Sequence, residues 1–367
     1  MADIAGSPLT VTLLQFVDDG LWDNPWHSLA EATADLSDDD LDYHPVAGVT
    51  GHWASDMSRP ARYAARAILR HLIGSTLEAG DLLPEPRAPS SVSWDDLEPF
   101  DWEAGARGIV AAAGVAHRQS RDRAAAVGED DLWQECAADG ALAHFSNAEV
   151  VAQCLVLHPP WHLGQLALIP KWRRMGAGRP PTPGMASREE RLAPCGDWPY
   201  RMAPVSTRRE LLLELLRQAQ ETCPWHALER TLVGLTNEEA SWEHHPGTPD
   251  DNALPISFYC LHVATCDVIY ADQAFGERRD DWDWAGQLVG ANDGLPPAEA
   301  SKALCRRGYE FLVGSISSAP EDSFDIVRPM HHGHPMAGWQ VVAAMVQHRL
   351  WHAGQIAMIR DAYAGVG

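Results

Sequence analysis

The sequence contains the frame H-x-x-W-H-x-G-Q twice, as HPPWHLGQ at 158–165 and as HRLWHAGQ at 348–355. The two copies begin 190 residues apart. A repeat of this kind constrains the architecture strongly, because repeated sequence units adopt the same supersecondary structure and pack against one another. We therefore expect the chain to consist of two copies of one structural unit.

Other matches between the two halves keep the same order along the chain. Pro25-Trp26-His27 matches Pro224-Trp225-His226 at an offset of 199, and His71 matches His262 at an offset of 191. One loop that is present only in the first half explains the change in offset. The segment between the halves is rich in proline and glycine and has no apolar period, which is typical of a linker. The expected divisions are a first domain at 1–175, a linker at 176–204 and a second domain at 205–367.

Each half contains four segments with helical periodicity or with an apolar run of helical length. Strand patterns are almost absent. Four antiparallel helices joined by loops of this size form a four-helix bundle, in which metal and cofactor sites lie between facing helices. The predicted fold class is all-α, with two tandem four-helix bundles. The predicted helical segments are 8–20, 62–80, 103–126 and 147–172 in the first half and 207–221, 256–276, 298–316 and 338–365 in the second.

Composition excludes several classes of partner. The 367-residue chain has a formal net charge of −23, which repels nucleic acid and anionic membrane surfaces. The opening MADIAGSPLT lacks the basic start and the apolar core of a signal peptide, and no apolar run approaches the ~20 residues of a membrane span. The seven cysteines are irregularly spaced and form no C-x-x-C pair, which favours free thiols in a reducing compartment. We expect a cytoplasmic protein with no nucleic-acid or membrane partner.

The second frame carries a candidate metal site. His348 and His352 are four residues apart, so they lie on one helix face and are able to ligate one metal ion. His348 follows the apolar run VVAAMVQ, where an unpaired imidazole is costly to bury. His262, in the apolar second helix of the same half, is the expected third ligand. Three histidines leave the fourth position of the metal open, as in catalytic sites. The alternative is that all three are core histidines satisfied by their neighbours.

The first half offers an equivalent set, His71, His158 and His162. The interval between the first two ligands is nearly the same in both halves, 87 and 86 residues. The difference between the frames is Pro159-Pro160. Proline lacks a backbone N–H and disfavours the α region for the residue before it. We expect the helix to kink or restart here and His158 and His162 to converge with poorer stagger, so the sequence leaves open whether this second site binds metal.

Three further residues are candidates for roles around the second-half site, although no catalytic residue is identified. Gln355 follows the second ligand, where an amide would orient a ligand or a bound water; helix-terminal packing is the alternative. Asp267, beyond His262 on the same helix, is a candidate hydrogen-bond acceptor or general base, or else a solvated residue. His334, which matches His144, is a candidate for the pocket mouth or for a solvated loop.

These features resemble the DinB/YfiT-like superfamily of metal-binding four-helix bundles. The resemblance covers both halves, and hence most of the chain. It rests on a long first helix, a lone histidine in the second helix, the stretch LTNEEASWEHHPG between them, and HRLWHAGQ in the fourth helix. It implies a divalent metal ion on His262, His348 and His352, with one open coordination position. Zinc and nickel are the metals that the resemblance favours, with iron as a further candidate.

The resemblance also implies a metal-dependent enzyme. Family members include thiol S-transferases that use mycothiol or bacillithiol and a mycothiol-dependent maleylpyruvate isomerase. A small-molecule substrate and a low-molecular-weight thiol are therefore the expected partners. The alternatives are a metal-dependent hydrolase or isomerase acting on a small molecule, and a non-catalytic metal- or ligand-binding module. Many members are homodimers of single bundles, so the tandem chain is expected to be a monomer whose domains form an internal pseudo-dimer.

Overall fold

The structure is a computed structural model. It describes residues 8–18, 24, 26–43, 64–83, 104–136, 145–176, 201–223, 226–246, 254–278, 295–331 and 333–364. These residues are mostly helical, and the described part of each of the eight predicted segments is largely helical, which confirms the all-α prediction. None of the described helices is both long and apolar enough to cross a membrane. His144 and most of the predicted linker, 177–200, lie outside the described residues.

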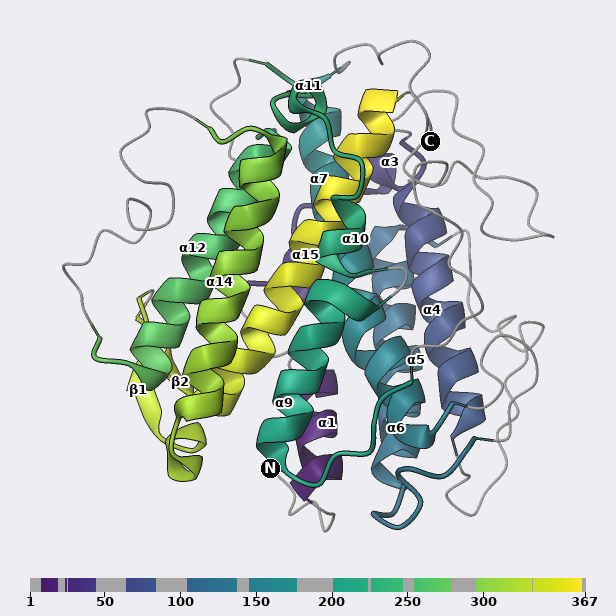
Figure 1. Cartoon of the computed structure of the whole chain (residues 1–367). Helices are drawn as coiled ribbons and strands as arrows, with labels where there is room; N and C mark the ends of the chain where they lie inside the picture. Colours follow the sequence, from purple (N-terminus) through teal and green to yellow (C-terminus); the bar gives the residue numbers. More distant parts are fainter. Residues whose placement is uncertain are drawn as a thin grey trace.

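The two helices that carry the repeated frame lie at the centre of the molecule. α7 (His158–Met175) and α15 (Gly338–Ala364) pack against each other. In Figure 1, α15 is the yellow helix that crosses the middle of the molecule. Every residue from 341 to 364 is buried, although the amphipathic pattern of α15 is weak. A helix covered on all sides belongs to the core of a large domain rather than to its surface.

A pair of long helices flanks this centre on each side (Figure 1). α12 (Ile256–Phe275) and α14 (Ala298–Ser318) pack together, and α12 packs on α15. α4 (Ala65–Leu82) and α5 (Ala106–Ala125) pack together, and α4 packs on α7. The remaining long helices are α1 (Pro8–Asp18), which contacts α5, and α9 (Arg208–Arg217), which contacts α1, α14 and α15.

Local sequence explains several helix starts. Thr207 Oγ1 accepts the N–H of Glu210, and the Glu210 carboxylate accepts the N–H of Thr207, which is a capping box at the start of α9. Thr236 Oγ1 accepts the N–H of Glu239 in the same way. The short helical elements are α2 (Leu29–Thr33), α3 (Asp38–Leu41), α6 (Asn147–Val150), η5 (Gln218–Thr222), α10 (Leu228–Thr231), α11 (Asn237–Ala240) and η6 (Glu321–Phe324).

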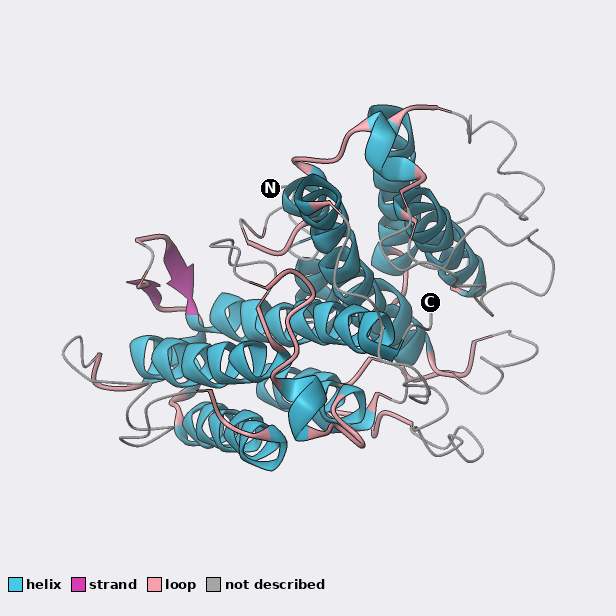
Figure 2. Ribbon diagram, turned by 90° about the horizontal axis from the view of Figure 1, so that it is seen from above, coloured by secondary structure: helices cyan, strands magenta, loops and turns pink. Residues whose placement is uncertain are grey.

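A small β-hairpin is present that the sequence pattern does not predict. β1 (Val327–Pro329) and β2 (Pro335–Ala337) are antiparallel, and Val327 lies opposite Ala337. The hairpin projects from the edge of the helices (Figure 2). Gly333, in the loop between the strands, has a φ of +80°, a conformation that favours glycine. Strands of three residues are too short to produce a readable alternation of apolar and polar residues.

Of the two outcomes expected at Pro159-Pro160, a kink or a restart of the helix, the structure shows the restart, because α7 begins at His158 with both prolines in its first turn. The residues before α7 form a π-helical segment, η4 (Val151–Leu157), and His158 keeps a helical φ of −68° and ψ of −48°. The N–H of His158 donates to the carbonyl of Gln153, five residues back. We attribute the continuity of the helix to this wider turn, because a proline ring clashes with the carbonyl four residues back in a regular α-helix. The two prolines then stand in the first turn of α7, where their missing N–H groups are tolerated.

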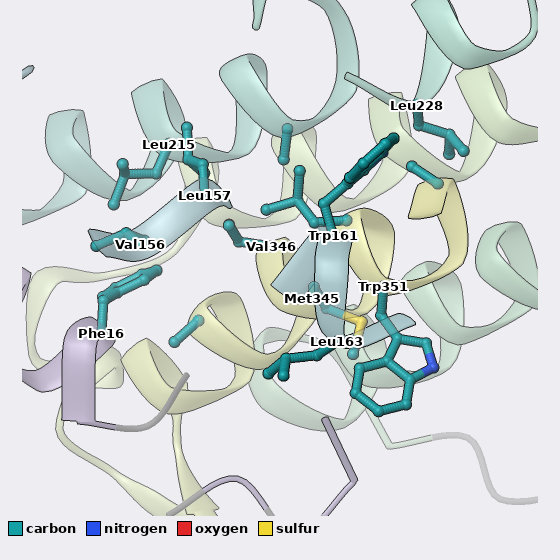
Figure 3. Close-up of a cluster of buried hydrophobic side chains, with 14 of the residues drawn as sticks. Phe16, Val156, Leu157, Trp161, Leu163, Leu215, Leu228, Met345, Val346 and Trp351 are labelled. Carbon is teal, nitrogen blue, oxygen red and sulfur yellow. The ribbon is translucent and has the colours of Figure 1, made fainter. Parts of the chain in front are cut away.

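α7 and α15 touch backbone to backbone at the glycines of the two frames. A Cβ on Gly164 would lie 2.0 Å from the carbonyl oxygen of Trp351, and a Cβ on Gly354 would lie 1.9 Å from the carbonyl oxygen of Trp161. Both distances are far inside van der Waals contact, so only glycine permits this approach. Figure 3 shows the surrounding apolar cluster, in which the ring of Trp161 extends toward Leu228 and Met345 lies beside the ring of Trp351.

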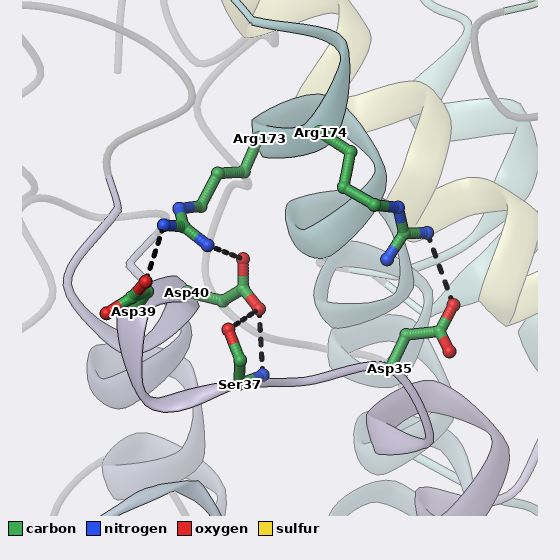
Figure 4. Close-up of polar contacts among 6 residues, drawn as sticks. All are labelled: Asp35, Ser37, Asp39, Asp40, Arg173 and Arg174. Carbon is green, nitrogen blue, oxygen red and sulfur yellow. Dashed lines mark hydrogen bonds and ion pairs between the residues drawn. The ribbon is translucent and has the colours of Figure 1, made fainter.

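Ion pairs tie the C-terminal end of α7 to the segment around α3 (Figure 4). Arg173 pairs with Asp39 at 2.8 Å and with Asp40 at 3.4 Å, and Arg174 pairs with Asp35 at 3.2 Å. Cations are also favoured at this end of a helix by the helix dipole. Because all of these side chains except Asp40 are exposed, the pairs contribute little to stability. Their main effect is to orient the last turn of α7.

The glycine contact predicts that replacing glycine by alanine changes the free energy of unfolding in opposite directions at Gly354 and at Gly314. Gly354→Ala should lower the free energy of unfolding by about 1–3 kcal/mol, because the helices must separate to accommodate the methyl group. Gly314 is the matched control, since it lies on α14, is exposed, and has no atom within 4 Å of the point that an added methyl group would occupy. Gly314→Ala should raise the free energy of unfolding by about 0.5–1 kcal/mol through helix propensity. Urea unfolding measures both, and equal stability of the two variants would refute the contact.

Candidate metal centres

The second-half histidines His262, His348 and His352 converge, and we call them the C-terminal triad. His262 lies on α12, and the other two lie one turn apart on α15. His348 Nε2 is 3.0 Å from His262 Nε2 and 3.0 Å from His352 Nε2. The centroids of the three rings are 4.9, 4.9 and 4.5 Å apart. Helices from two different positions in the chain thus bring three imidazole nitrogens to one point.

The first-half histidines His71, His158 and His162 form an equivalent N-terminal triad. His71 lies on α4 and the other two lie at the start of α7. His71 Nε2 is 3.0 Å from His158 Nε2, and the ring centroids are 4.9, 4.8 and 4.6 Å apart. These spacings nearly equal those of the C-terminal triad. The expected loss of stagger at His158 is therefore absent, because the helical backbone is retained through the prolines.

An amide determines the protonation of one histidine in each triad. His352 Nδ1 is 2.7 Å from Gln355 Oε1, and His162 Nδ1 is 2.8 Å from Gln165 Oε1. An amide oxygen only accepts hydrogen bonds, so the ring proton of both neutral histidines is on Nδ1. Each Nε2 then presents its lone pair, which is the form of imidazole that ligates metal. Gln355 and Gln165 thus lie where they orient a ligand of their own triad.

The two histidines of each triad that lie on α7 or α15 are buried, and the third, His71 or His262, is partly buried. Burial, followed by the neighbouring rings, lowers the pKa of His158, His348 and His352 well below the usual range. Burial lowers the pKa of His71 to about 4. Where the lone pairs of such imidazole nitrogens meet in a buried site they repel each other, and a cation between them would satisfy these lone pairs. The donor set therefore fits a metal ion that accepts nitrogen ligands.

One side chain next to each triad differs between the two centres. Cys266, one turn after His262 on α12, has Sγ 3.8 Å from His262 Nε2. Ser75, one turn after His71 on α4, has Oγ 3.3 Å from His158 Nδ1. Burial raises the pKa of the Cys266 thiol to about 12, and its sulfur lies with His262 and His348 in a group that could hold a metal ion. A spacing of four residues from a predicted ligand is the sequence signal that identifies both residues.

Asp267 has a different partner from the one expected from the sequence. Its Oδ2 is 2.6 Å from Arg349 Nη2, and both side chains are fully buried. Five residues along an α-helix rotate a side chain by about 140°, so Asp267 and His262 face different neighbours. Burial raises the pKa of Asp267 to about 7, although the Arg349 guanidinium acts in the opposite direction. The residue is one half of a structural ion pair between α12 and α15.

His334 lies in the exposed loop of the β-hairpin. Its carbonyl accepts the N–H of Met330 at 3.1 Å, and its ring centroid is 5.8 Å from that of Trp26. Trp26 also contacts Tyr270 of α12, with centroids 6.1 Å apart. His334 therefore packs on the residue that precedes His27, and the match to His144 falls outside the described residues.

A fourth histidine that the sequence pattern did not predict lies beside each triad. The ring centroid of His27 is 5.0 Å from that of His348, and the centroid of His226 is 5.1 Å from that of His158. Each of these histidines comes from the opposite half of the chain. The repeated Pro-Trp-His motif is the available signal, but a repeat does not show which half its histidine enters.

Comparison with known proteins does not assign the chain to a family. No protein-family model matches the sequence, and no curated protein or solved structure is significantly similar to it. The interpretation of the two centres therefore rests on their geometry and on the motifs described above.

Breaking the buried Asp267–Arg349 ion pair is expected to lower the stability of the protein strongly. Asp267→Asn should lower the free energy of unfolding by about 3–5 kcal/mol, because a buried guanidinium loses its counter-charge. Replacing both residues, Asp267→Leu with Arg349→Met, should recover most of this loss, since no buried charge remains. Urea unfolding of the metal-free protein measures both effects. A single variant that loses less than about 1 kcal/mol would show that the pair is not buried in solution.

His117 on α5 provides a pH prediction that does not involve either triad. Its side chain is 2% exposed, and burial lowers its pKa from 6.5 to about 4. The unfolded chain therefore takes up this proton first, and stability is lost as pH falls from about 6.5 to about 4. The shift corresponds to on the order of 3 kcal/mol. When the pH falls through this interval, His117→Phe should lose less stability than the wild type, as measured by urea unfolding. Equal losses in the two proteins would contradict the lowered pKa of His117.

Proposed function

We propose that the chain consists of two tandem DinB-like four-helix bundles packed as an internal pseudo-dimer. The first bundle comprises α1, α4, α5 and η4–α7, and the second comprises α9, α12, α14 and α15. The repeated frame and the near-equal spacing of the two triads support this arrangement. The glycine contact between α7 and α15 would then occupy the place of a dimer interface. A sedimentation mass of one chain is expected, and a mass of two or more chains would count against the internal pseudo-dimer.

Each triad, in this proposal, holds one divalent metal ion, with zinc or nickel favoured and iron as a further candidate. The observation that carries this assignment is the convergence of three neutral imidazoles on one point in each half. The glutamine next to each second ligand adds the tautomer control that metal-ligating histidines usually receive. Three protein ligands leave a position for an exogenous molecule, which is typical of catalytic rather than structural sites.

The activity that we propose is transfer of a low-molecular-weight thiol, of the mycothiol or bacillithiol type, to an electrophilic small molecule. A divalent ion lowers the pKa of a thiol or water that occupies its open position. The sulfur forms a bond to the electrophilic carbon, the leaving group departs with the electron pair of the bond that breaks, and the thiol proton passes to the departing group. The buried walls exclude water, which would otherwise compete as a nucleophile. The choice of thiol chemistry rests on the resemblance of HRLWHAGQ and its surroundings to the DinB/YfiT-like superfamily.

Metal content tests the two centres separately. Protein purified from medium supplied with zinc, nickel and iron should contain about two divalent ions per chain. His348→Ala and His158→Ala should each leave about one ion, and the double variant none, because each change removes the central ligand of one triad. Elemental analysis by mass spectrometry measures this, with His117→Phe as the buried-histidine control that retains both ions. Absence of stoichiometric metal from the wild type would refute the proposal.

Thiol consumption then tests the chemistry. The metal-loaded wild type should accelerate the reaction of mycothiol or bacillithiol with an electrophile, and His348→Ala should lower that rate at least about 100-fold if the C-terminal centre is the working one. The assay follows loss of free thiol and formation of the thioether. A protein that holds metal but leaves the thiol unreacted would favour hydrolysis, isomerisation or a non-catalytic binding role.

A further inference from the structure

The two Pro-Trp-His segments deliver their histidines to the opposite half of the molecule in the same way. The ring centroid of His27 lies 5.0 Å from His348, 6.4 Å from His352 and 5.3 Å from Trp351. The centroid of His226 lies 5.1 Å from His158, 6.3 Å from His162 and 5.1 Å from Trp161. The two segments reproduce these three distances within a few tenths of an ångström. The positions of the His27 and His226 rings are therefore a repeated feature of the fold.

Each segment is anchored on the half that it enters. Asn24 Oδ1 accepts the N–H groups of Trp26 and His27 at 2.9 and 3.2 Å, and Asn24 Nδ2 donates to Gln347 of α15. These bonds hold the backbone of His27 against the helix that bears His348.

The second segment has a comparable anchor made of different residues. Cys223 Sγ is 3.4 Å from Gln153 Oε1 of η4 and 3.5 Å from His226 Nδ1. Gln153 Nε2 also donates to Gln218 of η5. The same placement of His226 is thus reached by another set of side chains, which indicates that the position of the histidine is what the two segments share.

His27 and His226 lie at the edge of the triads, and the ring nitrogens of His27, His348 and His352 lie within 4.8 Å of one another. Ring centroids within the triads are at most 4.9 Å apart, whereas each crossing histidine is more than 6 Å from the second ligand of its frame. His27 is nevertheless buried, at 7% exposure, and its Nδ1 has no hydrogen-bond partner among the described residues. A buried imidazole nitrogen without a partner is costly, so a polar ligand at this point would be stabilised by it.

We propose that His27 and His226 are positioning residues that hydrogen-bond the molecule occupying the open position of the centre in the opposite half. This inference rests on the proposed metal centres. A neutral imidazole has one N–H, which it would donate to the sulfur of a bound thiol or to the oxygen of a bound water. Each centre is then composite: one half supplies the three ligands, and the other half supplies the residue that orients the substrate.

The test uses a chain with a single centre. In the His158→Ala background, which retains the C-terminal triad, the protein is loaded with cobalt(II) and titrated with 2-mercaptoethanol. The sulfur-to-cobalt absorption band in the near ultraviolet reports thiol binding, and elemental analysis reports cobalt content. His27→Phe, which keeps an aromatic ring against Trp351, should retain one cobalt per chain and weaken thiol binding about 10- to 100-fold. His27→Gln, which restores an N–H donor, should recover part of the affinity, and His117→Phe should bind the thiol as the background chain does.

The reciprocal experiment tests whether each histidine acts on the centre of the opposite half. In the His348→Ala background, which retains the N-terminal triad, the loss of thiol affinity should follow His226→Phe and not His27→Phe. His27→Ala and His226→Ala serve as second variants if a phenylalanine variant does not fold.

Three outcomes would overturn the inference, and they are distinguishable. Unchanged thiol affinity in the His27 variants would show that the residue only packs against Trp351. Loss of cobalt from these variants, with an altered visible spectrum, would make His27 a direct metal ligand instead. Failure of the His158→Ala chain to bind cobalt at all would remove the proposed metal centre, and the inference with it.

Discussion

The close contact between α7 and α15 is the constraint on which the rest of the structure depends. The two backbones approach so closely at Gly164 and Gly354 that no side chain fits between them. This approach aligns two helices that each carry two histidines of one triad. It also leaves the flanking helices to supply the third histidine from each side, His262 from α12 and His71 from α4. Both candidate centres are therefore arranged around one helix–helix crossing.

This crossing gives a physical meaning to every letter of the repeated frame. The two histidines stand one helical turn apart and converge with a third, the glycine admits the neighbouring backbone, and the glutamine sets the tautomer of the second histidine. The tryptophan packs against the crossing histidine of the other half. Periodicity and spacing predicted the eight long helices and both triads, because these depend on interactions within one helix or on matching intervals between two.

What the sequence could not predict depends on interactions between elements. Pro159-Pro160 was expected to give His158 and His162 a poorer stagger, and local rules offer no way to foresee a π-helical segment just before the two prolines. Asp267 was a candidate acceptor or general base beside the C-terminal triad, or else a solvated residue, because it lies near His262 in sequence. A rotation of five residues instead turns it toward Arg349. The position of His27 beside His348 is set by the packing of one half on the other, which no motif within either half encodes.

The shared glycine contact also links the positions of the two candidate centres, because both depend on how α7 and α15 pack against each other. Gly164 lies two residues from His162 and Gly354 lies two residues from His352, and each glycine rests on the backbone between the other helix's histidines. A rotation or shift of α7 on loading one centre would therefore displace the support of the other. Coupling of this kind is reciprocal by thermodynamic necessity. In the proposed two-metal protein, the metal affinity of either centre would then depend on whether the other centre is occupied.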